Sequence, residues 1–176
     1  MYTLQADEKS TPVMIYSSDK LIRGEVVTKA SALVSGWLRT QGAPTYMHVL
    51  KASVISLASG TPRATNFEEI YFPTVECLAF HITPPAKDPL DYEPDEKNRI
   101  MQPMSLVVGG SFLFQGKLRV SAMTDLPTTM EGNRLSWLSF YELVVTNPLL
   151  PQMRLSVPMA LISAARITYG LGQQAS

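Results

Sequence analysis

The chain has 176 residues, enough for one large or two small domains, and its 15 lysines and arginines are balanced by 15 aspartates and glutamates. A formal net charge of zero gives no long-range field to gather nucleic acid or an anionic membrane, so partners of those kinds are disfavoured. Apolar residues make up 45% of the chain, which is typical of a globular protein and argues against disorder.

Short apolar segments bounded by Gly, Pro, Ser and Asp fill the first part of the chain. They are rich in β-branched and aromatic residues, which is typical of hairpin strands rather than helices. We expect strands at 13–16, 21–28, 46–57 and 80–83. The segment 32–38 is expected to be a further strand or a short helix. Pro73 is expected to begin a single helical turn ahead of the last strand, because proline is tolerated at the first position of a helix.

A polar, proline-rich segment follows. Residues 84–103 contain five prolines, and five acidic residues against three basic ones. Proline removes backbone donors and the charges oppose burial, so we expect an exposed, semi-extended connector. We therefore predict a first domain at 10–84, an acidic Pro-rich linker at 85–102 and a second domain at 103–172.

The second domain repeats the pattern of the first. SLVVGGSFLFQGKL at 105–118 aligns with VMIYSSDKLIRGEV at 13–26, and WLSFYELVV at 137–145 aligns with YMHVLKASV at 46–54. PMALISAARIT at 158–168 aligns with PTVECLAFHIT at 73–83, so Pro158 is expected to open a helical turn as Pro73 does. Gly116 falls at the position of Gly24, and we assign these two glycines and two prolines structural roles. The predicted fold class is all-β: two tandem small bent antiparallel barrels, each with a one-turn helix before the last strand.

Bent antiparallel strands, a glycine in the second strand and a one-turn helix before the last strand resemble the Sm-like and SH3-like class of small barrels. The run GEVVTKASALVSGWL, beginning at Gly24, also resembles uncharacterised bacterial single-barrel domains of the Chloroflexota. The resemblance implies the barrel architecture and a bacterial source. Sm proteins hold RNA with an Asp and a Met-Asn pair after the glycine and a closing Arg-Gly or Lys-Gly pair. These motifs are not matched here, so no functional residue is carried over.

Catalytic chemistry has one candidate pair in the sequence. A nucleophile and a base must lie within hydrogen-bond reach, and Cys77 and His81 are four residues apart. Their counterparts in the repeat are Ile162 and Arg166, so Cys77 occupies a core-type position. We expect a buried, inert cysteine and no enzymatic activity. The alternative is a thiol hydrolase centred on this pair.

Metal and phosphate motifs are not evident either. A zinc site would have to combine residues from several predicted strands: His48, His81, Cys77 and Glu76 or Glu68. Their spacing fits no metal motif. The Gly109-Gly110 pair lacks the lysine and helix of a phosphate loop and is expected to form a hairpin turn. We expect no metal and no cofactor.

The second domain combines few charges with clustered aromatic residues. Residues 100–176 carry three acidic and five basic residues, and the SFLFQG strand replaces Lys20 and Arg23 of the first domain by Phe112 and Gln115. Uncharged edge strands invite pairing with another chain. The residues expected to form an interface are Phe112, Phe114, Trp137, Phe140 and Tyr141. This surface is expected to contact a copy of the chain or another protein; the alternative is that it meets the first domain within one chain.

These observations predict a non-catalytic structural or adaptor protein that acts through protein–protein contacts or self-assembly, as a homo-oligomer. The alternative is binding of RNA or single-stranded nucleic acid. Its basic residues would be Lys117, Arg119, Arg134, Arg154 and Arg166. The polar first ten residues lack the apolar segment of a signal peptide, one cysteine cannot form an internal disulfide, and no apolar run is long enough to span a bilayer. We therefore expect a cytoplasmic protein.

Overall fold

The computed structural model describes residues 2–40, 43–58, 60–87, 89–132 and 136–171. The strands are β1 (Glu8–Tyr16), β2 (Lys20–Lys29), β3 (Tyr46–Ser56), β4 (Arg63–Pro73), β5 (Ala79–Ile82), β6 (Arg99–Val108), β7 (Phe112–Ser121), β8 (Trp137–Thr146), β9 (Arg154–Ser163) and β10 (Thr168–Gly170). The helices within these ranges are short: α1 (Val34–Trp37), the 3-10 helix η1 (Thr74–Glu76) and α2 (Leu126–Gly132). None of them has the length and apolar character needed to cross a membrane. The prediction of an all-β protein is confirmed.

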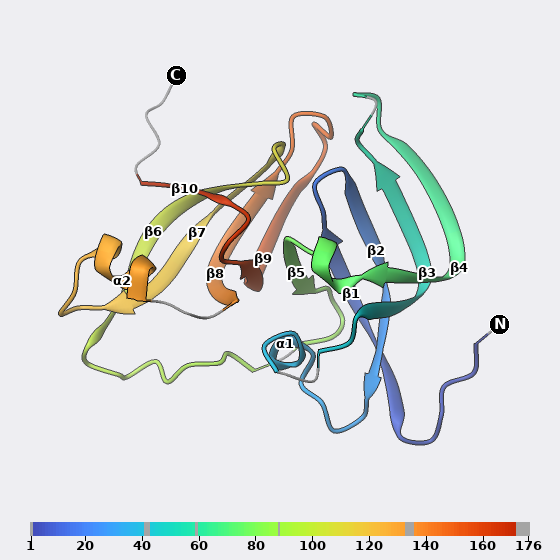
Figure 1. Ribbon diagram of the computed structural model, residues 1–176, viewed down its shortest axis with the longest axis horizontal. Helices are drawn as coiled ribbons and strands as arrows, with labels where there is room; N and C mark the ends of the chain where they lie inside the picture. The colour runs from blue at the N-terminus through green and yellow to red at the C-terminus, as the bar shows by residue number, and fades with distance from the viewer. Residues whose placement is uncertain (1, 41–42, 59, 88, 133–135, 172–176) are drawn as a thin grey trace.

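All ten strands belong to one antiparallel sheet, in the order β10-β6-β7-β8-β9-β5-β1-β2-β3-β4. The central link is β5, where Phe80 faces Ile15 of β1 on one side and Leu161 of β9 on the other. The sheet therefore continues from one half of the molecule into the other, and the prediction of two separate barrels is not confirmed. Its edge strands, β4 and β10, lie at opposite ends of the molecule (Figure 1).

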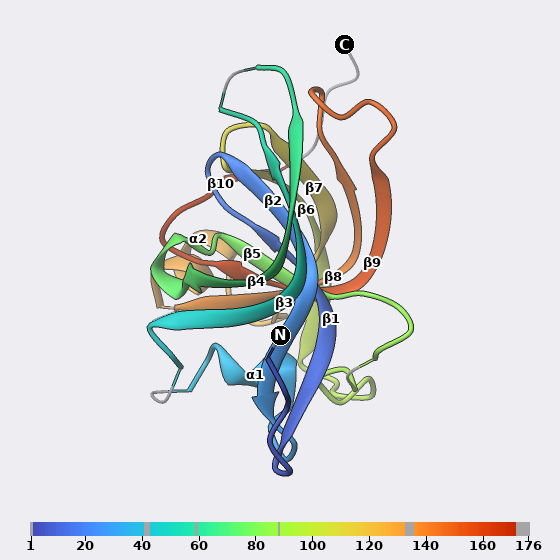
Figure 2. The same cartoon turned by 90° about the vertical axis from the view of Figure 1, so that its right-hand side faces the viewer.

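The two halves of the sheet have the same strand order. We call β1–β5 the first half and β6–β10 the second half; their orders are β5-β1-β2-β3-β4 and β10-β6-β7-β8-β9. In both halves a short helix lies between the second and third strands, and the strands twist strongly as they cross the molecule (Figure 2). The first two sequence alignments match corresponding strands: β1 and β2 with β6 and β7, and β3 with β8.

The third alignment, of 73–83 with 158–168, is wrong. Tyr46 lies opposite Pro73, and its counterpart Trp137 lies opposite Ser163, so Pro73 corresponds to Ser163. Pro158 lies inside β9, facing Glu142, the one position that the β8–β9 register skips. A strand tolerates proline there because no ladder hydrogen bond needs its N–H.

The expected one-turn helix is therefore present in one half only. Pro73 ends β4 and η1 follows it directly, as predicted. Between β9 and β10, residues 164–167 form a turn and not a helix, so this part of the prediction is wrong for the second half. The segment 32–38 contains α1, which agrees with the helical alternative.

Gly24 and Gly116 lie at matching bends. The β2–β3 register shifts next to Gly24 and the β7–β8 register shifts next to Gly116. The residues bulging opposite them, Lys51 and Glu142, have φ values of 49° and 50°. A Cβ atom would lie 2.9 Å from a backbone oxygen of β3 at Gly24, and 2.8 Å from one of β8 at Gly116. Only glycine permits this close approach of neighbouring strands.

The apolar core is shared between the halves. One cluster of buried residues joins Tyr16 and Ala79 of the first half to Phe112, Phe114 and Phe140 of the second. The other joins Val13, Ile15 and Phe80 of the first half to Trp137 and Leu161 of the second. Full burial of such side chains contributes about 2 kcal/mol each, so the contact between the halves is a substantial part of the folding free energy.

Candidate functional site

The junction between the halves is a backbone-paired contact. The Ser163 N–H donates to the Leu78 carbonyl at 2.8 Å, and Ala79 and Phe80 of β5 face Ile162 and Leu161 of β9. The hairpin turn at Gly109 packs against the turn at Ser17; a Cβ atom at Gly109 would meet the Ser17 oxygen at 2.4 Å. Corresponding turns of the two halves therefore touch each other beside the paired strands.

All five predicted interface residues are buried. Phe112, Phe114 and Phe140 are fully buried, and Tyr141 and Trp137 are 5% and 8% exposed. The Tyr16 ring packs edge-on against Phe112 and Phe114, with centroids 5.0 and 4.9 Å apart. These rings are not available to a second chain, so this part of the interface prediction is wrong. For Phe112 and Phe114 the within-chain alternative describes the structure.

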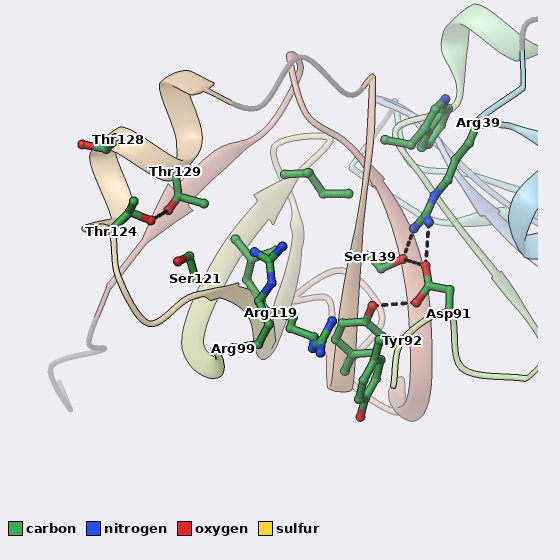
Figure 3. Close-up of a pocket in the computed structure, with 14 residues that line it drawn as sticks. Arg39, Asp91, Tyr92, Arg99, Arg119, Ser121, Thr124, Thr128, Thr129 and Ser139 are labelled. Carbon is green, nitrogen blue, oxygen red and sulfur yellow. Dashed lines mark hydrogen bonds and ion pairs between the residues drawn. The ribbon is translucent and has the colours of Figure 1, made fainter. Parts of the chain in front are cut away.

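Trp137 and Tyr141 also line a cleft between the linker and the second half. The cleft has a volume of about 480 Å³ (Figure 3). It is lined by Arg39, Asp91, Tyr92, Arg99, Leu118, Arg119, Ser121, Thr124, Thr128, Thr129, Trp137, Leu138, Ser139 and Tyr141. Arg39, Ser139 and Asp91 lie at one end and the three threonines at the other.

Asp91 of the linker is the acidic residue in the lining of this cleft. Its carboxylate accepts hydrogen bonds of 2.6 Å from the Ser139 hydroxyl, the Tyr141 hydroxyl and the Arg39 guanidinium. Burial alone would raise the pKa of Asp91, but these hydrogen bonds and the Arg39 charge outweigh it and hold the pKa below its ordinary value. Burial, and then the Asp91 contact, raises the pKa of Tyr141. Asp91 thus ties the linker to both halves.

The other end of the linker is held by arginines. Arg119 donates to Glu96 at 2.5 Å and to the Glu93 carbonyl at 3.0 Å, and its guanidinium lies 4.8 Å above the Tyr92 ring. Arg99 also contacts Glu96, at 3.4 Å. The acids of the linker thus neutralise the arginines of the cleft. The sequence analysis did not predict that the linker docks on the second half. The pattern that could have indicated it is the excess of acidic residues in the linker beside the excess of basic residues in the second half. The linker is also shorter than predicted, because β6 begins at Arg99.

The basic residues of the nucleic-acid alternative are mostly engaged within the chain. Lys117 contacts Glu142 at 2.5 Å, Arg119 contacts Glu96, and Arg166 donates to the Val75 carbonyl. Arg154 is exposed at the start of β9. Arg134 lies outside the described residues. Of the four bases that the structure describes, three are therefore engaged with acceptors of the same chain.

Cys77 and His81 point to different partners. The buried Cys77 thiol donates to the Ala79 carbonyl at 3.4 Å, and burial raises the pKa of the thiol. The buried His81 ring contacts the Tyr16 hydroxyl at 3.0 Å and the Ile82 carbonyl at 3.1 Å, and burial lowers its pKa to about 4. His81 also borders an apolar pocket of about 360 Å³ between β5, β9 and the linker.

The residues that a zinc site would have to combine, which include His48, His81 and Cys77, are not grouped in the structure. His48 Nε2 lies 3.2 Å from a Glu69 oxygen, and its ring stacks on Tyr71 with centroids 4.6 Å apart. Among the described residues, no three His, Cys, Asp or Glu side chains are grouped so that they could hold a metal ion.

Apolar positions that are buried at the β5–β9 junction have exposed counterparts at the two outer ends of the described sheet. Tyr46 is 54% exposed, whereas its counterpart Trp137 is 8% exposed; Tyr71 is 59% exposed, whereas its counterpart Leu161 is 1% exposed. These pairs are equivalent because His48 faces Tyr71 as Ser139 faces Leu161. At the other edge Val107 is 42% exposed, whereas its counterpart Ile15 is fully buried. At both outer ends of the sheet, the positions equivalent to those buried at the junction therefore carry exposed apolar side chains.

Comparison of the chain with protein-family models, with curated proteins and with solved structures finds no match. The resemblance to Sm-like barrels stays a prediction. Among this chain's own surfaces, the two edges of the described sheet carry the clearest pattern.

Proposed function

We propose that this protein is a non-catalytic structural protein that works by self-assembly through protein–protein contacts. The contact region is the β4 surface, which we define as Tyr46 of β3 with Phe67 and Tyr71 of β4. The observation that carries the proposal is the exposure of Tyr46 and Tyr71, whose counterparts in the second half are buried against the first half.

Two further properties of the β4 surface support the proposal. Aromatic side chains are the residue types that most often anchor protein interfaces, because they bury a large area at a small cost in conformational entropy. In addition, β4 has a paired neighbour, β3, on one side only within the described sheet. A free strand edge offers backbone donors and acceptors to an incoming strand, which is a common mode of protein recognition.

Nucleic-acid binding remains the alternative, and no specific contact favours it. Three of its five bases are engaged with acceptors of the same chain. Tight oligonucleotide binding that weakens steeply with salt would favour this alternative, because phosphate contacts release counterions.

The experiment that tests the proposal is light scattering as a function of protein concentration. We expect a weight-average mass that rises above the 19.4 kDa of one chain at high micromolar concentration. Tyr71→Lys places a charge on the β4 surface and is expected to return the mass to that of one chain. Met123→Lys also replaces an exposed apolar residue, but in the segment between β7 and α2 and not on an edge strand, and is expected to behave as wild type. A wild-type protein that stays at 19.4 kDa at every concentration would overturn the proposal.

A further inference from the structure

We propose that the partner of the β4 surface is a second copy of this chain, joined head to tail, with β10 of one chain pairing antiparallel with β4 of the next. This inference rests on the proposed function and names the partner of the same surface. The template for the contact is the junction inside the chain, where the last strand of one half pairs with the fourth strand of the other.

The register of β10 places Thr168 where the first half has Phe80. Phe80 faces Ile15 of β1, and Thr168 faces Val107 of β6. Ile15 and Val107 occupy the same position of their strands, because β1 and β2 align with β6 and β7 along their whole lengths. Thr168 is exposed, whereas Phe80 is buried between β1 and β9. Within the described sheet, the outer side of β10 therefore lacks the neighbour that β5 has.

The register of β4 places Tyr71 where the second half has Leu161. Since Phe80 faces Leu161 in the junction, the same arrangement between two chains sets Thr168 of one chain opposite Tyr71 of the next. Ile167 then faces Phe72, as Ala79 faces Ile162. The proposed contact would cover Tyr71 and Tyr46 on one chain and Val107 on the other, which are three of the exposed apolar residues on the outer strands.

The charges along β4 favour this register. Arg63, Glu68 and Glu69 precede the segment Ile70–Phe72, which has no charge, and β10 (Thr168–Gly170) has none either. Charged residues along an edge strand discourage pairing. The uncharged segment of β4 corresponds to the part of β9 that pairs with β5, so the open part of the edge coincides with the expected contact.

The contact between chains would be weaker than the junction within a chain. Pro73 stands at the position of Ser163, whose N–H donates to the Leu78 carbonyl, and proline has no N–H to repeat that bond. Two separate chains also lose translational and rotational freedom when they associate, whereas the two halves are tethered. We therefore expect association that is reversible and depends on concentration.

A head-to-tail contact joins two different surfaces, so each chain keeps one free edge after pairing. Such contacts produce a closed ring or a growing filament, whereas a symmetric dimer uses the same surface twice. This difference allows a direct test by mixing two variants. Tyr71→Lys blocks β4 and leaves β10 intact. Thr168→Lys blocks β10 and leaves β4 intact. Both replaced residues are exposed, so both variants are expected to fold.

The experiment measures mass by light scattering for each variant alone and for their equimolar mixture. Each variant alone is expected to have the mass of one chain, because every contact then sets a lysine against its partner strand. The mixture is expected to reach twice that mass and stop, because one intact β4 meets one intact β10. Met123→Lys serves as the control and is expected to match wild type.

The outcomes separate this inference from the proposed function. If wild type associates and the mixture stays at the mass of one chain, the head-to-tail arrangement is wrong while self-assembly stands. If Thr168→Lys alone associates as wild type does, β10 is not part of the contact and the inference is overturned. If wild type itself is a monomer, the proposed function fails as well.

Discussion

The first and second halves share one strand order and one bend geometry, yet they bury different positions. Leu161 and Trp137 of the second half are buried because the first half lies against them, while Tyr71 and Tyr46 occupy the same positions of the first half in the open. The difference in burial therefore arises from whether another half packs against these positions, and not from their place in the strand. A surface whose counterpart is already an interface is therefore a candidate interface itself.

A second comparison concerns the matching bulges. Glu25 of β2 contacts Lys51 of β3 at 2.8 Å, and at the same place in the second half Lys117 of β7 contacts Glu142 of β8 at 2.5 Å. Both bulges therefore carry an ion pair between the two strands, but the acidic and the basic residue have exchanged strands. What the two halves share is the geometry of the bend, which the glycines make possible.

The largest expected effect comes from filling the space at these bends. A Cβ atom at Gly116 would lie 2.7 Å from Leu143 Cδ2 and 2.8 Å from the Tyr141 carbonyl oxygen. We expect Gly116→Val to lower the free energy of unfolding by about 4 kcal/mol, because the neighbouring backbone must move. Chemical denaturation measures the change, and Gly24→Val is expected to show a similar loss.

The control for this prediction is Gly36→Ala in α1, where a Cβ atom meets nothing closer than 3.9 Å. It is expected to be neutral or slightly stabilising. If Gly24→Val were costly and Gly116→Val harmless, the two bends would not be equivalent.

The next effect is a pH dependence of stability that arises from His81 of β5. The counterpart of His81 in β10 is Tyr169. The folded-state pKa of His81 is about 4, and an imidazole in the unfolded chain has its ordinary value of 6.5. Between these values the unfolded chain binds a proton that the folded chain does not. The free energy of unfolding therefore has its full His81 contribution above pH 6.5 and falls by about 3 kcal/mol as pH drops towards 4.

Denaturation at a series of pH values checks this. His81→Gln, whose amide can still accept from Tyr16, is expected to flatten the slope between pH 6.5 and 4. His48→Gln, which removes the other imidazole, is the matched control for the substitution. An equal slope in wild type and His81→Gln would contradict the account of the buried ring.

A smaller effect is expected from Asp91, which attaches the linker to both halves. Asp91→Asn removes the charge that accepts from Ser139, Tyr141 and Arg39. We expect a loss of about 1 to 2 kcal/mol in the free energy of unfolding, because three donors lose a charged acceptor. Asp95→Asn, in an exposed part of the same linker, is the control and is expected to change little. Equal effects of the two variants would show that Asp91 does not anchor the linker.

The smallest effect tests the reversed ion pairs. Lys117→Glu alone sets two acids at the bulge and is expected to cost about 0.5 kcal/mol. Adding Glu142→Lys recreates the arrangement of Glu25 and Lys51 and is expected to restore the wild-type value. A double variant no more stable than the single one would show that the second bend does not accept the ion pair of the first.

Local sequence patterns predicted several strands and the structural role of the two glycines, but they did not predict β4 (Arg63–Pro73). Gly24 and Gly116 stand in similar apolar contexts, and the alternating segments at 13–28 and 46–57 form strands close to those bounds. The strand that carries Pro158 was misread because proline suggested a helix start. A bulge on the neighbouring strand removed the need for its N–H, and that is a property of the pair of strands that one strand's sequence does not reveal.

The surfaces were harder to predict for a related physical reason. Phe112 and Phe114 have the apolar character of an interface, but they meet Tyr16, which lies about a hundred residues away in the chain and is brought close by the β5–β9 pairing. Tyr71 is not among the residues predicted from the sequence to form an interface. Its importance appears only once its position is compared with that of Leu161 in the folded sheet.

The measurement that most directly tests the central claim, that the two unlike edges are partner surfaces, is hydrogen exchange at low and high protein concentration. We predict slower exchange at high concentration in both β4 and β10, with no change at the β5–β9 junction, which is already paired within the chain. Exchange that is independent of concentration at both edges, or slowed at one edge alone, would contradict the account.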